Sequence, residues 1–465
     1  MIQPPSPPHA VAPWLRALEP DASPYYLQIA DQIAQAVGAG ALRPGDRLPP
    51  QRQLAQHLGV DLTTITRGYA EARHRGLLQA RGAQGSFVAE PRAELARMID
   101  LSMNLPPPPL GVSLDALIQR GLNEVLARHD ASMLMTYHLG GGDPASREAG
   151  AAWLAPMLGR VDPQRIAVCS GAQSALAALI LSQTGIGDAL VTEPLVYPGL
   201  RSAAAQLGRR VVAAQADADG LLPDALERAC REHGARLLYL NPTLHNPTTR
   251  TMPEGRRRDI VRVARALDLQ IIEDDPYWLL EDDAPPPLAQ LAPERSHYVS
   301  TLSKCLTPGL RTAYALLPDA GAHERFLAAL RSVVLMSAQL MTGLTTQWML
   351  DGSAARLLEG VRGEARARQA LARQWLPATA RVPAGGIHVW QDLPARWTPH
   401  TLARVARDEG FGITPSDAFC VDGPAPNSVR LSLGGVPDRA QLTIALKKLA
   451  RLLERDPAAS QDIVI

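Results

Sequence analysis

The first periodic pattern along the chain lies near its N-terminus. Apolar residues recur at helical spacing over 26–37, and glycines follow to end the helix. A second short helix is predicted over 51–57, and Asp61 can cap a third. The segments 77–80 and 86–89 are predicted to be two strands joined by a glycine-bearing turn. Three helices and a hairpin in this order predict a winged helix-turn-helix, an α-helical unit with a β-hairpin wing.

The pattern changes beyond residue 115. Short apolar runs now alternate with amphipathic segments, and the runs cover 166–169, 189–191, 237–240 and 269–272. Short buried strands that alternate with helices indicate an α/β domain whose parallel sheet is covered on both faces. From about residue 346 the chain is more helical before two further strand-like segments, so we expect a smaller second lobe over about 346–455.

The segments between these patterns predict the domain boundaries. Residues 1–23 are rich in Pro and Ala without periodicity, which predicts a flexible tail before the winged unit of 24–90. Residues 91–115 contain four consecutive prolines and are expected to form a stiff, extended linker. The α/β domain with its large and small lobes is then expected over 116–455.

Composition excludes several classes of protein and indicates a cellular compartment. The chain has 465 residues and a net charge of +1, which argues against a polybasic membrane binder or an acidic tail. No stretch reaches ~18 consecutive apolar residues, and the N-terminus lacks the pattern of a signal peptide. Four widely separated cysteines form no CxxC pair, which argues against a structural metal site and for a reducing cytoplasm.

Lysine is scarce in this chain. Of the 47 basic residues, the lysines are Lys304, Lys447 and Lys448, and the others are arginines. Arginine can replace lysine almost anywhere except where an amine must act as a nucleophile. The isolated Lys304 is therefore a candidate for amine chemistry.

The N-terminal unit resembles the GntR-type winged helix-turn-helix. The resemblance runs from about Pro24 to Ala89 and rests on Leu48-Pro49-Pro50-Gln51-Arg52-Gln53-Leu54-Ala55, Leu58-Gly59-Val60, Thr63-Thr64-Ile65 and Gly76-Leu77-Leu78. It implies binding of double-stranded operator DNA, with the third helix in the major groove. The implied DNA-contacting residues are Arg52 on the second helix, Thr63, Thr64 and Arg67 on the third, and Arg81, Gly85 and Ser86 at the wing.

A structural alternative exists for this unit. Residues 24–90 hold seven arginines against five acidic residues, a modest excess for a nucleic-acid binder. The arginines could simply keep a helical subdomain soluble. The ordered motif favours DNA binding over this alternative.

The surroundings of Lys304 resemble the lysine motif of fold-type I, pyridoxal-phosphate-dependent aminotransferases. The motif reads Ser300-Thr301-Leu302-Ser303-Lys304 and continues to Arg311. A pyridoxal site needs a Schiff-base amine, a carboxylate for the pyridine nitrogen, a phosphate cradle and a ring platform. The resemblance covers roughly residues 115–455 and implies that Lys304 forms an internal aldimine with pyridoxal 5'-phosphate.

The resemblance assigns the other parts of the site in chain order. Asp274 is expected to pair with the pyridine nitrogen, since it lies three residues before Tyr277, and Asp275 is the competing carboxylate. Tyr277 and Asn246 are the expected donors to the phenolic oxygen, and Tyr197 the ring platform. The implied phosphate cradle consists of Ser170, Gly171, Ala172, Thr301 and Arg311, with Tyr137 reaching the phosphate of a neighbouring subunit. Arg430 matches the arginine that binds a substrate carboxylate.

Two local features lie outside this pattern. Thr249 stands where the family usually has glycine, which predicts a shift of the loop that carries Asn246. The run Arg256-Arg257-Arg258 is expected to be an exposed helix face.

A GntR-type reader followed by an aminotransferase-like domain resembles the MocR family of bacterial transcription regulators. The resemblance implies a homodimer that binds operator DNA and senses pyridoxal phosphate, an amino compound, or both through Lys304. The alternative is a catalytically active class I or II aminotransferase with an accessory DNA-binding domain. In a third interpretation the pyridoxal site merely stabilises the dimer.

Overall fold

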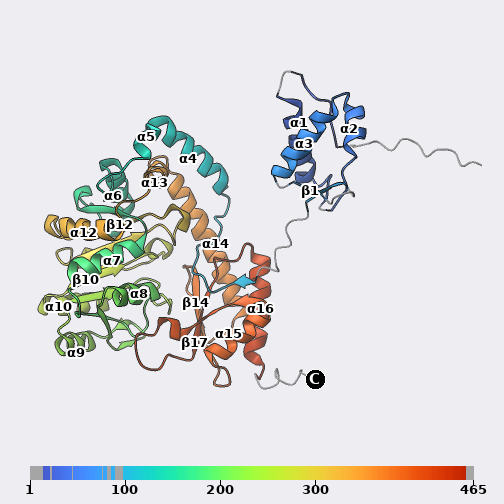
Figure 1. Cartoon of the computed structure of the whole chain (residues 1–465). Helices are drawn as coiled ribbons and strands as arrows, with labels where there is room; N and C mark the ends of the chain where they lie inside the picture. Colours follow the sequence, from blue (N-terminus) through green and yellow to red (C-terminus); the bar gives the residue numbers. More distant parts are fainter. Residues whose placement is uncertain are drawn as a thin grey trace, which may run out of the picture. The chain divides into compact units, whose positions relative to one another are not determined.

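The computed structural model describes residues 14–20, 23–43, 45–75, 77–80, 85–89 and 98–456. The chain divides into two compact units, Met1–Arg97 and Met98–Ile465 (Figure 1). Most of the predicted tail of 1–23, the tip of the wing and residues 90–97 of the predicted linker lie outside the described residues.

Among its described residues, the first unit contains three helices and a two-stranded hairpin. Its elements are α1 (Tyr25–Gly38), α2 (Gln51–Leu58), α3 (Leu62–His74), β1 (Leu78–Ala80) and β2 (Ser86–Val88). The strands pair antiparallel, with Leu78 opposite Val88. Ile29, Ile33 and Ile65 are fully buried between the helices, because apolar side chains at helical spacing share one face. This is the predicted winged helix-turn-helix.

In the part of the chain that the structure describes, seven strands form the central sheet of the second unit. Their order is β4 (Ile166–Cys169), β12 (Ala313–Leu316), β11 (Ser296–Thr301), β10 (Gln270–Asp274), β9 (Leu237–Leu240), β5 (Ala189–Thr192) and β6 (Arg210–Ala213). β12 runs antiparallel to both of its neighbours, while the other pairs are parallel. The sheet is therefore mixed, whereas the apolar runs predicted a parallel one.

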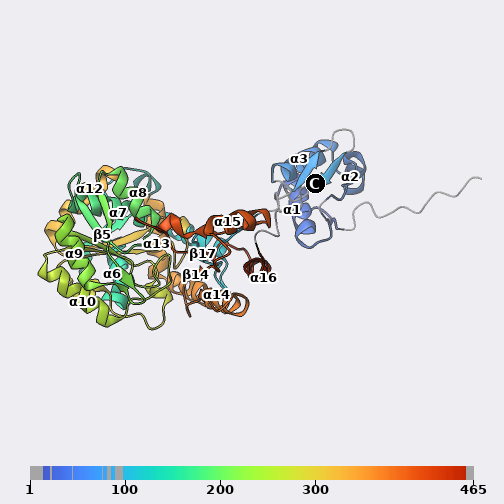
Figure 2. The ribbon, with the colours of Figure 1, turned by 90° about the horizontal axis from the view of Figure 1, so that it is seen from below.

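Helices cover both faces of this sheet. Alternate residues of β9 separate the faces: Leu237 and Tyr239 pack with one group of helices, and Leu238 and Leu240 pack with the other, because successive strand side chains point to opposite faces. The first group is α7 (Ala172–Gln183), α8 (Pro198–Gln206) and α12 (Ala320–Val333), and the second is α9 (Pro223–His233), α10 (Glu254–Ala266) and α11 (Leu288–Leu291). Figure 2 shows α7 and α8 on one side of the strands and α10 on the other.

Further helices complete the large lobe near β4. They are α4 (Leu114–Arg128), α5 (Ala131–Leu134), α6 (Pro144–Leu158) and α13 (Gln339–Leu350), and a short hairpin of β7 (Ala216–Asp217) and β8 (Gly220–Leu221) lies elsewhere on the lobe. Buried residues of α4, α6 and α13 share one core with Ile166 and Val168 of β4. Among the described residues, no helix is both long and apolar enough to cross a bilayer.

The small lobe is built on an antiparallel sheet of β13 (Ala380–Arg381), β14 (His388–Asp392), β17 (Ser428–Ser432) and β16 (Thr414–Pro415). Its helices are α14 (Ser353–Trp375), α15 (Pro399–Asp408) and α16 (Arg439–Glu454), which lie together in Figure 1. Their apolar faces bury a core that includes Val389, Leu431 and Leu446.

The second unit begins earlier than the sequence predicted. β3 (Ile99–Asp100) pairs with β15 (Phe411–Gly412) of the small lobe, and Leu101 is fully buried. Residues 98–115, which the proline-rich composition assigned to an extended linker, are thus packed into the second unit. The physical reason is that a small-lobe strand supplies the hydrogen bonds that this extended segment needs.

Candidate functional site

One edge of the large sheet gathers the predicted cofactor residues. The parallel strands β4, β5, β9, β10 and β11 end at this edge, and ligands of α/β sheets bind at the carboxyl ends of strands. Because β12 is antiparallel, it starts where the others end, and so the residue two positions before it, Arg311, reaches the same edge. The one antiparallel strand of the described sheet therefore contributes to the site.

A cavity of about 500 Å³ lies at this edge, between the two lobes of the second unit. Its described lining includes nine predicted residues: Ala172, Tyr197, Asn246, Asp274, Tyr277, Thr301, Lys304, Arg311 and Arg430. Ser170 and Gly171 are not among the described lining residues but contact Arg311, whose Nη2 donates to the Ser170 carbonyl at 3.3 Å. The structure thus brings together side chains from positions 170 to 430.

Strand alternation separates the two neighbouring aspartates. Asp274 lines the cavity, and its Oδ2 accepts a hydrogen bond from Tyr239 at 2.8 Å. Asp275 points to the opposite side of the sheet, where its Oδ2 accepts from Thr243 and Tyr298 at 3.3 Å each. Burial raises the pKa of Asp274 to about 7, and its Oδ1 has no hydrogen-bond partner among the described residues.

Lys304 lies in the turn after β11, within the cavity. Its Nζ donates a hydrogen bond to the backbone carbonyl of Asn104 at 2.6 Å. Burial lowers the pKa of Lys304 to about 8, Arg430 acts in the same direction, and Asp274 opposes them. A lysine whose pKa lies this low has a substantial neutral fraction near pH 8 and can act as a nucleophile.

The donors on the other side of the cavity form a connected network. The Tyr277 hydroxyl accepts from Asn104 Nδ2 at 2.7 Å. Arg430 Nη1 donates to Asn246 Oδ1 at 2.9 Å, and both residues line the cavity. Burial lowers the pKa of Arg430 to about 10, and its guanidinium carbon lies 4.9 Å from the centre of the Phe419 ring.

The loop that carries Asn246 contains Thr249 where the family usually has glycine. Thr249 has φ +62°, in the left-handed region that favours glycine. Its backbone N–H donates to the His245 carbonyl at 2.7 Å, and Asn246 lines the cavity. The threonine therefore adopts the backbone conformation expected of a glycine at this position.

Two features of the cavity fit pyridoxal phosphate, one at Asp274 and one at Gly171 and Arg311. Buried Asp274 lines the cavity and its Oδ1 has no hydrogen-bond partner among the described residues, as expected of a carboxylate for a pyridine nitrogen. A side chain at Gly171 would approach Arg311 Nη2 to 2.7 Å, so the glycine lets that guanidinium lie against the N-terminal end of α7. A helix N-terminus beside an arginine suits a phosphate dianion.

Tyr137 lies elsewhere. It is 81% exposed and is not among the described residues that line this cavity. Three apolar residues near Tyr137 in the sequence are also exposed: Met133 at 67%, Met135 at 73% and Leu139 at 78%. Its expected contact with the phosphate of a neighbouring subunit stays a prediction.

Several lining or supporting residues were not predicted from the sequence. They are Ser102, Met103, Asn104, Gln173, Asn241, Ser303 and Phe419 in the lining, and Tyr239 beneath Asp274. Tyr239 had a usable signal, since a hydroxyl in a fully apolar buried strand must find a polar partner. The segment containing Ser102–Asn104 was interpreted as a linker and so was not considered.

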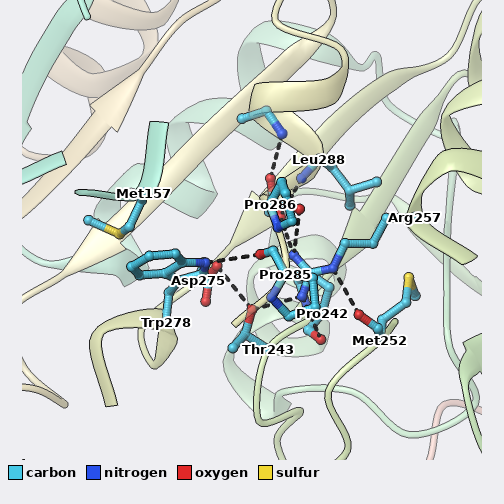
Figure 3. A network of polar contacts seen from close by, with 12 residues as sticks. Met157, Pro242, Thr243, Met252, Arg257, Asp275, Trp278, Pro285, Pro286 and Leu288 are labelled. Carbon is cyan, nitrogen blue, oxygen red and sulfur yellow. Dashed lines mark hydrogen bonds and ion pairs between the residues drawn. The ribbon is translucent and has the colours of Figure 1, made fainter. Parts of the chain in front are cut away.

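Arg257 contradicts the exposed helix face expected for the run Arg256-Arg257-Arg258. Its side chain is fully buried, and it donates to the carbonyls of Pro242, Met252 and Pro286 and to the Thr243 hydroxyl (Figure 3). Its Nη1 lies 3.7 Å from Glu273 Oε1, and Glu273 also accepts from two backbone N–H groups of α11. Arg257 therefore ties the Pro242–Met252 loop to the end of β10.

The predicted DNA-contacting residues lie on the helices expected of them. Arg52 is exposed on α2, Thr63 and Arg67 are exposed on α3, and Thr64 is half-buried. The Arg67 guanidinium carbon lies 4.3 Å from the ring centre of Tyr26. Gly85 and Ser86 lie at the start of the wing strand β2, whereas Arg81 lies outside the described residues.

Comparison with known proteins divides the chain in the same way. The family model of bacterial regulatory proteins of the gntR family matches residues 25–88. The model of class I and II aminotransferases matches residues 96–449, which is most of the chain.

Similar proteins share both modules or the larger one. The HTH-type transcriptional regulator YdeF of Bacillus subtilis is 28% identical over 95% of this chain and 97% of its own. The vitamin B6 salvage pathway transcriptional repressor PtsJ of Salmonella typhimurium is 27% identical over 90% of this chain and 96% of its own. The structure of LysN, the α-aminoadipate aminotransferase of Thermus thermophilus, superposes with a TM-score of 0.71 at 25% identity, covering 84% of this chain and 99% of LysN. The chain therefore belongs to the class I and II aminotransferase family and, with its gntR-family domain, has the architecture of the MocR transcription regulators.

Proposed function

We propose that this protein is a cytoplasmic transcription regulator that binds operator DNA as a homodimer and responds to pyridoxal phosphate, to an amino compound, or to both. The observation that carries the proposal is the presence, in one chain, of a DNA-binding unit and a cavity in which Lys304, Asp274 and Arg311 converge. PtsJ, a relative with this architecture, is named as a transcriptional repressor of vitamin B6 salvage. We extend the link between vitamin B6 and transcription to this chain.

The residues of the cavity have distinct roles in this proposal. Pyridoxal phosphate, when bound, supplies an aldehyde that reacts with amines and a ring that withdraws electrons. Lys304 supplies the amine, and its lowered pKa provides the neutral form that such a bond requires. Asp274 holds a positive pyridine nitrogen, and Tyr277 and Asn246 donate hydrogen bonds toward the phenolic oxygen. Arg311, Thr301 and the residues from Ser170 to Ala172 bind the phosphate.

Homodimerisation explains an exposed apolar surface of the large lobe. The exposed residues of this surface are Met133, Met135, Tyr137 and Leu139. A second cavity of about 400 Å³ is lined in part by residues of the same segment, namely Leu134, His138 and Leu139. Apolar side chains this exposed favour association, and in a homodimer Tyr137 would reach the phosphate site of the partner subunit, as the family resemblance implies. Sedimentation of wild-type protein and of Tyr137→Glu compares the dimer fraction; an unchanged fraction would exclude Tyr137 from the interface.

The test of the regulatory function is binding to the DNA upstream of the protein's own gene. Fluorescence anisotropy with and without pyridoxal phosphate, at several salt concentrations, measures affinity and the number of phosphate contacts. Salt-sensitive binding that changes with the cofactor supports the proposal. Binding that ignores the cofactor points to an amino compound as the signal, and lack of binding in both states refutes the regulatory function.

An active aminotransferase is the second candidate. The specific observation in its favour is that Lys304, Asp274, Tyr277 and Arg430 all face one cavity, as a reaction on an amino acid would require. Rapid loss of the visible absorbance with several amino acids, with formation of free oxo acid, would support an enzyme. A spectral change that stops after binding would support a sensor.

A further inference from the structure

The turn Ser102–Asn104 forms part of the wall of the cofactor cavity. Ser102, Met103 and Asn104 all contribute to its lining, on the side of Arg430 and Lys304. The two outer residues of this turn direct backbone carbonyls at the two cationic side chains that the proposed function assigns to ligands. The chain thus places its own backbone where a ligand would bind.

Arg430 is engaged by this turn. Its Nη2 donates to the Ser102 carbonyl at 2.5 Å, and Thr414 Oγ1 donates to the same oxygen at 3.1 Å. Its Nη1 is engaged by Asn246, and its Nε, which is buried, has no partner among the described residues. A carboxylate that pairs with a guanidinium through two parallel hydrogen bonds uses Nη2 together with Nη1 or Nε, so it competes with the Ser102 carbonyl for Nη2.

Lys304 holds the other end of the turn. Its Nζ donates to the Asn104 carbonyl at 2.6 Å, and Asn104 Nδ2 in turn donates to Tyr277. When the Lys304 amine forms a covalent bond with an aldehyde, it can no longer make this contact as an ammonium group. Cofactor binding and carboxylate binding therefore each remove one of the two contacts between a cation and the turn.

Asp100 organises the turn from its upstream side. Its Oδ1 accepts from the Ser102 backbone N–H at 2.7 Å, from the Ser102 hydroxyl at 2.5 Å and from the Met103 N–H at 3.2 Å. Asp100 is itself the last residue of β3, which pairs over two residues with β15. Residues 90–97 are all that separates the end of the wing at Ala89 from Met98 in the sequence. The turn is therefore separated from the DNA-binding unit by only a short stretch of sequence.

We infer that the Ser102–Asn104 turn is a built-in occupant of the carboxylate subsite, and that an amino-acid carboxylate displaces it from Arg430 to alter DNA binding. The inference rests on the proposed function and specifies how its site is regulated. Exchange of a neutral carbonyl for a carboxylate favours the ligand, because the acceptor then also carries a charge and can accept two parallel hydrogen bonds from the guanidinium. The occupied subsite lowers the apparent affinity for carboxylates but not for ligands that lack one.

Two reduced cofactor analogues test the displacement directly. The phosphopyridoxyl adduct of L-alanine carries the cofactor and a carboxylate, whereas pyridoxamine phosphate carries the cofactor alone. Hydrogen–deuterium exchange of the full-length protein loaded with each compound reports on the amides of Ser102, Met103 and Leu105. We expect faster exchange at these amides with the alanine adduct, while Ile99 and Leu101 stay protected by β15. Equal or slower exchange with the adduct would overturn the inference.

Asp100→Ala tests the link to DNA without any carboxylate ligand. The pyridoxal-loaded variant should bind operator DNA as the wild type does with the alanine adduct, and should bind that adduct about fivefold or more tightly with unchanged affinity for pyridoxamine phosphate. Asp162→Ala is the matched control, because Asp162 accepts from the N–H two residues on at 2.9 Å and is exposed on another loop. Asp100→Asn should restore much of the wild-type behaviour.

The outcomes separate the inference from the proposed function. If neither analogue binds, the cofactor part of the proposed function fails and the inference fails with it. If both bind but the exchange rates or the affinities of Asp100→Ala match those of the wild type, the inference alone fails. If Asp100→Ala does not fold, Thr414→Val removes the second donor to the Ser102 carbonyl and should shift the affinity for the adduct in the same direction.

Discussion

Tyr239→Phe tests the electrostatics of the cofactor cavity through a single hydroxyl group. Tyr239 and Asp274 lie on neighbouring strands, 1% and 5% exposed, and the tyrosine donates to Asp274 Oδ2 at 2.8 Å. Burial raises the pKa of Asp274 to about 7, and this hydrogen bond lowers the pKa by stabilising the carboxylate. The substitution removes the donor and keeps the ring, which packs in the core beneath α7.

The expected loss follows from the strength of one charge-assisted hydrogen bond. Such a bond contributes about 2 kcal/mol in a buried setting, which corresponds to roughly 30-fold in affinity. Asp274 Oδ1 already lacks a partner among the described residues, so no second donor there compensates for the loss. We expect Tyr239→Phe to bind pyridoxal phosphate about 30-fold more weakly.

The assay is titration of cofactor-free protein with pyridoxal phosphate, followed by visible absorbance, across a range of pH. The negative charge that we propose Asp274 supplies to a pyridinium is present above the pKa of Asp274 and lost below it. Wild-type affinity should therefore fall as the pH drops through about 7. In Tyr239→Phe the fall should begin at a higher pH, because the ionised carboxylate is less stable without its donor.

Tyr298→Phe is the matched control. Tyr298 is also fully buried and donates to an aspartate, but that aspartate is Asp275, on the other face of the sheet. Its loss should leave cofactor affinity nearly unchanged. Equal losses in the two variants, or a change of less than twofold in Tyr239→Phe, would refute the reasoning.

Three further predictions concern other parts of the chain. Lys304→Ala should abolish the visible absorbance of bound pyridoxal while far-ultraviolet circular dichroism stays unchanged; an unaltered visible spectrum would contradict the assignment of the amine. Arg257→Met should lower the free energy of unfolding by about 3–5 kcal/mol in urea titrations, because it leaves buried Glu273 without its cation. Adding Glu273→Gln to this variant should recover part of the loss. A loss below about 1 kcal/mol in Arg257→Met alone would show that the ion pair is dispensable. Arg67→Ala should weaken operator binding about tenfold with unchanged pyridoxal content, and unaltered DNA affinity in anisotropy would remove Arg67 from the interface.

Local patterns determined the fold class and the order of the chemical groups. The winged unit followed from helical periodicity over 26–37 and from the strands around the wing, since side chains at fixed spacing share a face whatever the rest of the chain does. The choice of Asp274 over Asp275 also came from spacing, and strand alternation places Asp274 in the cavity. In each case the residues concerned lie within a short stretch of the sequence.

Tertiary structure decided which polar groups became partners across long separations. Arg257 has the sequence context of an exposed helix face, yet carbonyls from the loop before and the segment after β10 bury it (Figure 3). Ser102 lies 328 positions before Arg430, and its carbonyl reaches that arginine because β3 pairs with β15.

One physical reason explains why local patterns could be predicted from the sequence and long-range polar contacts could not. Local periodicity is set by backbone geometry, which repeats every 3.6 or 2 residues and can be recognised within a short window. A backbone carbonyl has no sequence signature, since every residue carries one, so its use as a partner depends on where the folded chain brings it. The sequence by itself determined the modules and predicted the lysine and the set of cofactor residues. Only the folded structure placed a stretch of predicted linker in the subsite of Arg430 and a tyrosine beneath Asp274.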